Sequence, residues 1–365
     1  MAERTADASP SPTRGRPVRG LRNDPGGPGL LRGPRARSVG LVVAVGALAV
    51  TLLASVLVGY RYLSPTEVYS AYWNFTGSDT DLVVLHLRVP RALAGVAVGA
   101  ALGVSGVLVQ GITRNPLGDP GILGINSGAS LATVVAIGVL GISDLPVYVL
   151  FAFGGAALAA VMVHLVGSLG SGGADPIKLT LAGAALSALL GSVTSALVLS
   201  DRASLEEYRF WVVGSLSGSE GMGAVLGQAA PFLLLGMLLA FGSTRALNAV
   251  ALGDDLARSL GTRVWAVRAV SALAVVLLAG TATAVAGPIG FVGIAVPHIA
   301  RLLVGPDHRW VLPWSAVLAP ILLLTADMVG RVVARPEELQ VGIVTALIGA
   351  PFFIVLVRRR RVAGL

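Results

Sequence analysis

The chain contains no cysteine, which excludes disulfide bonds and thiolate metal ligands. Charged residues make up only 13% of it, too few for the polar surface of an ordinary soluble domain. A GxxxxGK[ST] loop is also missing, so the chain does not bind ATP as a P-loop protein. The sequence therefore shows no catalytic set and no cofactor or metal site, since its four histidines lack metal-ligand spacing: His86, His164, His298 and His308.

Apolar residues account for 55% of the sequence, and the mean hydropathy is +0.81. A helix needs about 20 predominantly apolar residues to cross the hydrocarbon core, so this composition predicts an all-α membrane protein. The eighth apolar run is short and contains Pro297, His298 and Arg301, and we expect protein rather than lipid to cover it. The ten predicted spans are 38–59, 88–109, 118–139, 145–167, 179–200, 224–243, 265–286, 290–304, 311–330 and 340–357.

Positive charge gathers at both ends of the chain. Eight arginines lie in residues 1–37, which are rich in Pro, Gly and Ser and are expected to be disordered, and four more form Arg358–Arg361. An even number of spans places both termini on one side, and the positive-inside rule makes that side the cytoplasm. We therefore expect a cytoplasmic tail (1–37), a membrane domain (38–357) and a basic cytoplasmic tail (358–365). No aromatic residues interleave with the arginines, which disfavours a nucleic-acid partner.

A faint internal duplication is also present. The small-residue span Leu93–Gly111 runs into the turn Asn115–Gly118, and the span Ser271–Gly287 runs into Pro288–Phe291. The predicted topology gives these two spans opposite directions. Inverted repeats of this kind are a common plan of membrane transporters.

Six segments resemble, in the family's order, the FecCD-type permeases of ABC importers for ferric siderophores, cobalamin and haem. They are RVPRALAGVAVGAALGVSGVLVQGITRNPLGDPGILGINSGA (88–129), KLTLAGAALSAL (178–189), FWVVGSLSG (210–218), LGDDLARSLG (252–261), GPIGFVGIAVPHIARLLVGPDHR (287–309) and ELQVGIVTALIGAPFFIVLV (338–357). The resemblance implies a ten-helix subunit in a dimer with an identical or related permease. It also implies two cytoplasmic ATPase subunits, which bind ATP-Mg, and an external substrate-binding protein. Gln340 departs from the family, which usually has proline there.

The predicted cytoplasmic segment 252–261 has the pattern of a short capped helix with an unpartnered apolar face. Glycine favours turns, acids suit a helix N-terminus, and apolar residues recur at helical spacing. The resemblance implies that this segment docks on the ATPase, although a simple surface helix is the alternative. Its residues are Gly253, Asp254, Asp255, Leu256, Ala257, Leu260 and Gly261.

Arg88, Arg91 and Arg331 lie at the external ends of predicted spans. Arginine pairs bidentately with carboxylates, and the resemblance implies that these residues meet glutamates of the binding protein. Two alternatives remain open. The arginines can instead anchor the chain at lipid headgroups, and Arg331 can pair with Asp327 one turn earlier.

Polar residues within the spans have two interpretations. The fifth span carries hydroxyl residues that the resemblance favours as a lining of the translocation pathway, although helix packing is an alternative. Asp327, His298 and Arg301 are candidates for a proton relay, but their positions near span ends favour structural hydrogen bonding. The pathway residues are Ser187, Ser192, Thr194 and Ser195.

The sequence thus predicts the permease of an ABC importer for a ferric siderophore in the bacterial cytoplasmic membrane. Cobalamin or haem as cargo is one alternative. An ion-driven secondary transporter that uses Asp327 is a second, and a membrane enzyme is a third that lacks a convergent reactive set.

Overall fold

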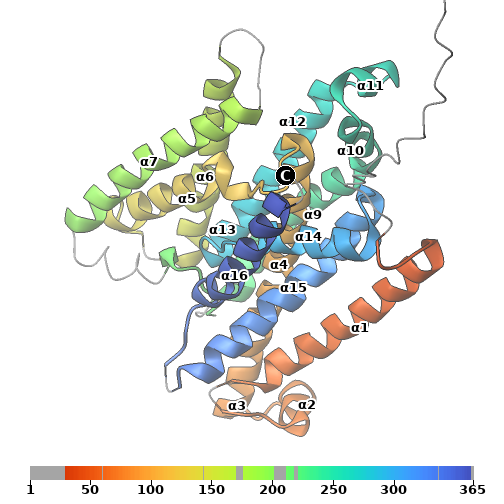
Figure 1. Ribbon diagram of the computed structural model, residues 1–365. Coiled ribbons are helices and arrows are strands. Elements are labelled where there is room, and N and C mark those ends of the chain that lie inside the picture. Colours follow the sequence, from red (N-terminus) through yellow and green to blue (C-terminus); the bar gives the residue numbers. More distant parts are fainter. Residues whose placement is uncertain are drawn as a thin grey trace, which may run out of the picture.

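The computed structural model describes residues 29–59, 61–142, 144–169, 176–200, 211–217, 221–335 and 337–362. Within these ranges the chain is built from helices and contains no strand (Figure 1). This architecture confirms the predicted fold class. Residues 1–28 of the expected N-terminal tail and 363–365 of the expected C-terminal tail lie outside the described residues.

In the described part of the chain, seven helices are long and apolar enough to cross a membrane, and three apolar helices are shorter. These ten segments occupy the positions of the ten predicted spans. The long ones are α1 (Pro34–Leu57), α3–η1–α4 (Asp79–Leu82, Val83–Arg88 and Val89–Thr113), α6 (Leu145–Ser168), α7 (Pro176–Ser200), α9 (Met222–Gly242), α12–η4–α13 (Val264–Val275, Val276–Gly280 and Thr281–Ala286) and α15 (His308–Val333). The shorter ones are α5–η3 (Ile125–Val134 and Val135–Val139), α14 (Val292–Val304) and α16 (Val341–Val362).

The third span begins later than its predicted position at residue 118. A turn and the 3-10 helix η2 (Pro120–Leu123) precede α5, which starts at Ile125. The Asp119 carboxylate accepts a hydrogen bond from the Gly121 N–H at 2.8 Å and holds this turn. A proline-containing, side-chain-bonded turn is incompatible with a continuous α-helix, although its residues are apolar enough to be counted in the span.

Helix α4 lies at the centre of the molecule because glycines let its neighbours approach its backbone. A Cβ atom at Gly99 would lie 2.6 Å from the backbone of Pro320, and one at Gly103 would lie 2.6 Å from the Ala319 methyl, both in α15. At Gly106 the carbonyl group of Gly293, in α14, occupies the space of a side chain. The small residues of this span therefore serve close helix packing, as they do in many membrane proteins.

The two halves that the sequence relates share an order of elements. In each, a long buried helix ends in a turn that leads to a shorter apolar helix: α4 to α5, and α12–η4–α13 to α14. Each turn also contains a non-glycine residue with positive φ, Arg114 at 49° and Phe291 at 68°, and the described residues include no others. The two long helices start at opposite ends of the molecule, as inverted repeats require (Figure 1).

Hydrogen bonds define the end of the molecule that carries the predicted cytoplasmic segment. The N–H groups of Leu30 and Leu31 donate to the carbonyls of Leu302 and Leu303 at 3.0 and 2.8 Å. Asn248, in α10 (Thr244–Ala251), donates to the Asp307 carboxylate at 2.6 Å. The first described residues, α10 and the turn before α15 therefore lie together, while α2 (Pro65–Trp73) and α3 lie at the opposite end (Figure 1).

Candidate functional site

The predicted coupling segment forms a helical hairpin at the end of the molecule. Helix α10 is followed by Gly253 and by the short helix α11 (Asp254–Ser259), which Gly261 separates from α12. The φ angles of Gly253 and Gly261 are 117° and 79°, and nothing lies within 4 Å of a Cβ atom built at either position. These glycines are therefore required by the backbone turns rather than by packing.

The apolar residues of α11 divide between two sides. Ala257 is buried beneath the helix, whereas Leu256 and Leu260 are 49% and 62% exposed. The exposed apolar face is thus narrower than the sequence predicts, because Ala257 packs α11 against the protein. The two leucines remain available to a partner.

Asp254 joins this hairpin to two membrane helices. Its carboxylate pairs with Arg114, at the end of α4, and with Arg268, in α12, at 3.1 Å. The Arg114 guanidinium also donates to the Val250 carbonyl in α10 at 2.7 Å. Arg258, within α11, lies 4.0 Å from the same carboxylate. One acid therefore links α11 to α4 and α12, and Arg114 extends this link to α10.

Local sequence reasoning places Asp254 at the helix N-terminus but does not identify Arg114 and Arg268. Arg114 and Arg268 lie 140 and 14 positions from Asp254 in the sequence. The available signal is that both arginines lie at ends of apolar runs on the side predicted to be cytoplasmic, where cations are common.

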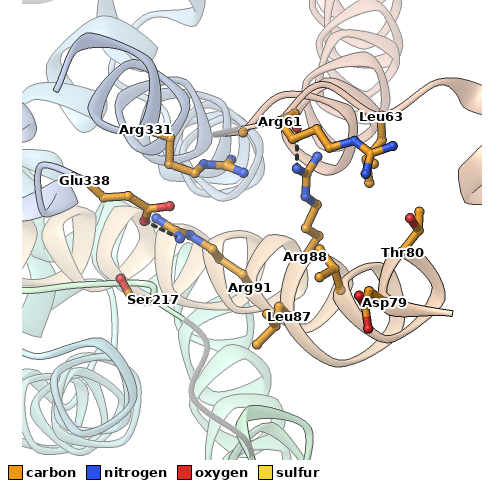
Figure 2. A pocket seen from close by; sticks show the side chains of 12 residues that line it. Arg61, Leu63, Asp79, Thr80, Leu87, Arg88, Arg91, Ser217, Arg331 and Glu338 are labelled. Atoms are coloured by element: carbon orange, nitrogen blue, oxygen red, sulfur yellow. Dashed lines mark hydrogen bonds and ion pairs between the residues drawn. The ribbon is translucent and has the colours of Figure 1, made fainter. Parts of the chain in front are cut away.

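The arginines predicted to be external form a second cluster, which Figure 2 shows in part. The Arg91 guanidinium lies 2.7 Å from the Asp327 carboxylate and 2.7 Å from that of Glu338. Asp327 also pairs with Arg331 at 3.0 Å, as one of the sequence alternatives proposes. The side chains of Asp327 and Arg331 are only 1% and 3% exposed. Glu338 is a member of the cluster that sequence reasoning did not assign.

Two of these arginines also hold the end of α1. Arg331 donates to the carbonyls of Ser55 and Val58 at 2.9 and 2.8 Å. Arg88 donates to the carbonyls of Val56 and Leu57 at 2.9 and 3.0 Å. Because the last carbonyls of a helix have no partner within it, these bonds complete the C-terminus of α1.

A cavity of about 470 Å³ opens beside this cluster. Arg61, Arg88, Arg91 and Arg331 contribute to its wall, together with Glu338 (Figure 2). The Arg61 side chain is 68% exposed, the Arg91 side chain 12%. The basic surface at this end is therefore carried by Arg61 more than by the buried Arg331.

The four hydroxyl residues assigned to the pathway do not share one environment on α7. Thr194 is buried, and its hydroxyl donates to the Leu190 carbonyl at 2.7 Å. Ser192 and Ser195 are exposed, while Ser187 is half-buried. The Ser192 hydroxyl donates to the Ala188 carbonyl at 2.8 Å. The exposed side of α7 thus carries Ser192 and Ser195, and packing accounts for Thr194.

His298 and Arg301, the other two relay candidates, have partners within the bundle. A ring nitrogen of His298 lies 2.7 Å from the Pro116 carbonyl, and Arg301 donates to the Gln110 side-chain oxygen at 2.6 Å. Gln110 in turn donates to the Gly293 carbonyl at 3.2 Å. Among the described residues, no group of three His, Cys, Asp or Glu residues could hold a metal ion. These contacts fasten α4 to α14 and satisfy costly polar groups.

A multi-pass helical bundle with a fastened hairpin at one end and a basic cavity at the other defines a membrane transport permease. The model of the FecCD transport family matches residues 47–359, and the chain belongs to that family. This result confirms the resemblance carried by the six segments.

Relatives and a solved structure agree with this assignment. The chain is 43% identical over 317 residues to the ferric enterobactin transport system permease protein FepD of Escherichia coli, covering 87% of this chain and 94% of FepD. It is 41% identical over 323 residues to the Fe(3+)-citrate import system permease protein YfmD of Bacillus subtilis, covering 88% and 91%. A metal-chelate type ABC transporter solved in an inward-facing conformation matches with a TM-score of 0.76 and 29% identity, over 88% of this chain and 99% of that one.

Proposed function

We propose that this chain is the membrane-spanning permease of a bacterial ABC importer for ferric siderophores. A separate pair of cytoplasmic ATPase subunits binds ATP-Mg and drives alternating access, and an external binding protein delivers the chelate. The permease itself binds no cofactor. The observation that supports this proposal best is the α10–α11 hairpin, whose two exposed leucines lie beside an acid that is fastened to α4 and α12.

The hairpin has the properties of a docking element. Leu256 and Leu260 offer an apolar surface of the size that a groove on a partner can cover, and an exposed apolar pair at the water-facing end of a membrane protein has no lipid to cover it. Force applied to α11 reaches α4 and α12 through the Asp254 carboxylate. The same arrangement without a partner would leave both leucines in water.

The first prediction tests this docking. Leu256→Asp places a charge in the proposed apolar contact, so we expect it to uncouple ATP hydrolysis from uptake while the protein still inserts and folds. Uptake of labelled ferric siderophore and phosphate release are measured in proteoliposomes that contain the full importer. We expect at least a tenfold loss of uptake, the effect of about 1.4 kcal/mol.

Leu252→Ser serves as the control variant. Leu252 is 62% exposed and precedes the turn at Gly253, so this variant also removes apolar surface from the hairpin. We expect it to retain most uptake. Normal transport by Leu256→Asp would refute the docking role of α11.

We propose that the external cavity receives the binding protein. The arginines expected to dock are Arg88, Arg91 and Arg331. Because the Arg331 side chain is only 3% exposed, its proposed role is to support the site rather than to contact the partner. Arg61 adds an exposed guanidinium at the same opening. Carboxylates on the binding protein would complement this basic surface.

The translocation pathway is proposed to lie against the exposed side of α7, between this subunit and a second copy or a related permease. Ser192 and Ser195 supply hydroxyls on that side. Both termini of the chain are proposed to lie in the cytoplasm. The cargo is proposed from the relatives named for ferric enterobactin and ferric citrate. Competition of labelled ferric siderophore uptake with unlabelled cobalamin and haemin distinguishes this cargo from the alternatives.

A further inference from the structure

Aromatic side chains gather on one small external element. Only 5% of the residues are aromatic, yet five exposed ones lie between positions 62 and 75, in and around α2. They are Tyr62, Tyr69, Tyr72, Trp73 and Phe75, with exposed fractions of 60, 62, 52, 72 and 56%. Exposed large aromatics are costly in water, so this concentration calls for a covering surface.

Helix α2 is divided lengthwise by the chemistry of its side chains. Tyr69, Tyr72 and Trp73 have the spacing i, i+3 and i+4, which places them on one face, and the rings of Tyr69 and Trp73 lie 6.2 Å apart. Ser70 and Asn74 lie on another side, with Glu67. The helix is therefore amphipathic along its solvent-facing surface.

The third side of α2 fixes the helix to the protein. Val68 and the fully buried Ala71 pack with Leu63, Val84 and Val89, which belong to the preceding loop and to the external part of the α4 helix. A capping box between Ser64 and Glu67 closes the N-terminus of α2. The orientation of the aromatic face is thus set by a small core of its own.

The polar side of α2 stays charged. The Ser64 N–H donates to the Glu67 carboxylate at 2.7 Å, and this bond lowers the pKa of Glu67. Arg61 lies 3.2 Å from the same carboxylate. A helix with one charged side and one aromatic side suits a boundary between water and an apolar phase.

Helix α2 follows directly on a helix whose surface is largely exposed. Only 17% of the residues in the most apolar stretch of α1 are buried, and its exposed residues include Val50 and Leu53. The Leu63 N–H donates to the Leu57 carbonyl at 3.0 Å, so the chain returns to the end of α1 just before α2 starts. Helix α2 therefore lies at the level where α1 leaves the hydrocarbon.

We propose that α2 is an interfacial helix whose aromatic face, Tyr69, Tyr72 and Trp73, rests on the headgroup and upper acyl region of the outer leaflet. Tyrosine and tryptophan suit this boundary because each combines an apolar ring with a polar group. The contact fixes the depth of the external end of the α4 helix, since α2 packs on Val84 and Val89. The arginine cavity beside it is thereby held above the membrane surface.

This chain contains no cysteine, so a single introduced cysteine is the one site in it that a thiol-reactive spin label can modify. Trp73→Cys and the matched control Asn74→Cys are spin-labelled in the full importer in liposomes. Accessibility to oxygen, which enters lipid, is compared with accessibility to a water-soluble nickel complex. We expect the label at position 73 to favour oxygen and the label at position 74 to favour nickel, with at least a severalfold difference in the ratio.

Lipid contact is also measured without a cysteine. Trp73→Phe is compared with the natural protein in liposomes whose lipids carry bromine near the headgroup end of the acyl chain. We expect the variant to lose part of the quenchable tryptophan emission. Equal nickel access at positions 73 and 74 would overturn the proposal, and so would unchanged quenching in Trp73→Phe. Shielding of position 73 only after the binding protein is added would also overturn it, because that result would assign this face to the binding protein.

Discussion

At the scale of single residues, Asp327 shows how a buried charge can be structural. Its carboxylate lies within 3.0 Å of two guanidiniums, Arg91 and Arg331, and its side chain is 1% exposed. Two ion pairs and almost complete burial hold this carboxylate between α4 and α15, so the geometry supports a fastening role.

Loss of the Asp327 charge is therefore expected to destabilise the permease. Asp327→Asn leaves Arg91 and Arg331 close together without a shared anion, which costs roughly 3 kcal/mol of unfolding free energy in comparable buried pairs. Unfolding in detergent is measured against Asp144→Asn, an exposed acid at the start of α6. An unchanged midpoint for Asp327→Asn would contradict the fastening role.

Reversal of the cavity charges tests the proposed binding-protein site. We expect Arg88→Glu with Arg91→Glu to weaken association with the binding protein by at least tenfold at low ionic strength. The natural protein should lose affinity as salt is added, because charge pairing at the cavity opening, where Arg61 is 68% exposed, is screened. Interferometry in nanodiscs measures both, with Arg309→Glu as the control on the opposite end. Equal affinities would instead favour a structural role for both arginines, through the contacts of Arg88 with α1 and of Arg91 with Asp327 and Glu338.

At the scale of elements, the proposed coupling hairpin, α10–α11, depends on ion pairs that cost little to break in water. The side chains of Arg114 and Asp254 are 39% and 25% exposed. Pairs at such positions contribute about 1 kcal/mol or less to stability. Their arrangement between α11 and two membrane helices therefore points to a mechanical role more than to a role in folding.

A double-mutant cycle measures this role. Arg114→Gln and Asp254→Asn are each expected to lower the amount of siderophore transported per ATP severalfold, with little change in the unfolding midpoint. The double variant should be no worse than Asp254→Asn alone, because that change already removes the link to Arg114 together with the link to Arg268. Arg258→Gln, whose 63% exposed side chain also pairs with Asp255, is the control. Additive losses would show that the two residues act independently.

Sequence reasoning recovers the elements whose cause is local. Runs of apolar residues predict the ten helical segments, and Gly253 with Asp254 predicts the turn and start of α11. The pairing of Arg91 with Asp327 spans 236 positions and depends on how α4 and α15 pack, which no local pattern contains. The π-helical turn at 276–280 is likewise invisible in hydropathy, because its residues are as apolar as an ordinary helix.

At the scale of the whole molecule, the energy source separates the two main classes of transporter. An ABC permease without its ATPase should accumulate nothing, whereas a secondary transporter needs only this chain. We expect purified chain in liposomes to show no accumulation of labelled ferric siderophore under an imposed proton or sodium gradient. Addition of the ATPase, ATP-Mg and the binding protein should restore it. Gradient-driven accumulation that Asp327→Asn abolishes would refute the ABC mechanism.

The glycines of α4 have a further thermodynamic consequence. In a soluble helix each interior glycine costs about 1 kcal/mol relative to alanine, because the unfolded chain is so much freer. Within a bilayer, a separated segment must still satisfy its own backbone and therefore stays helical. The separated helix in the bilayer therefore lacks most of the conformational entropy that an unfolded chain has in water. Gly99, Gly103 and Gly106 can thus admit the backbones of α14 and α15 at a much smaller cost than the same residues would carry in water.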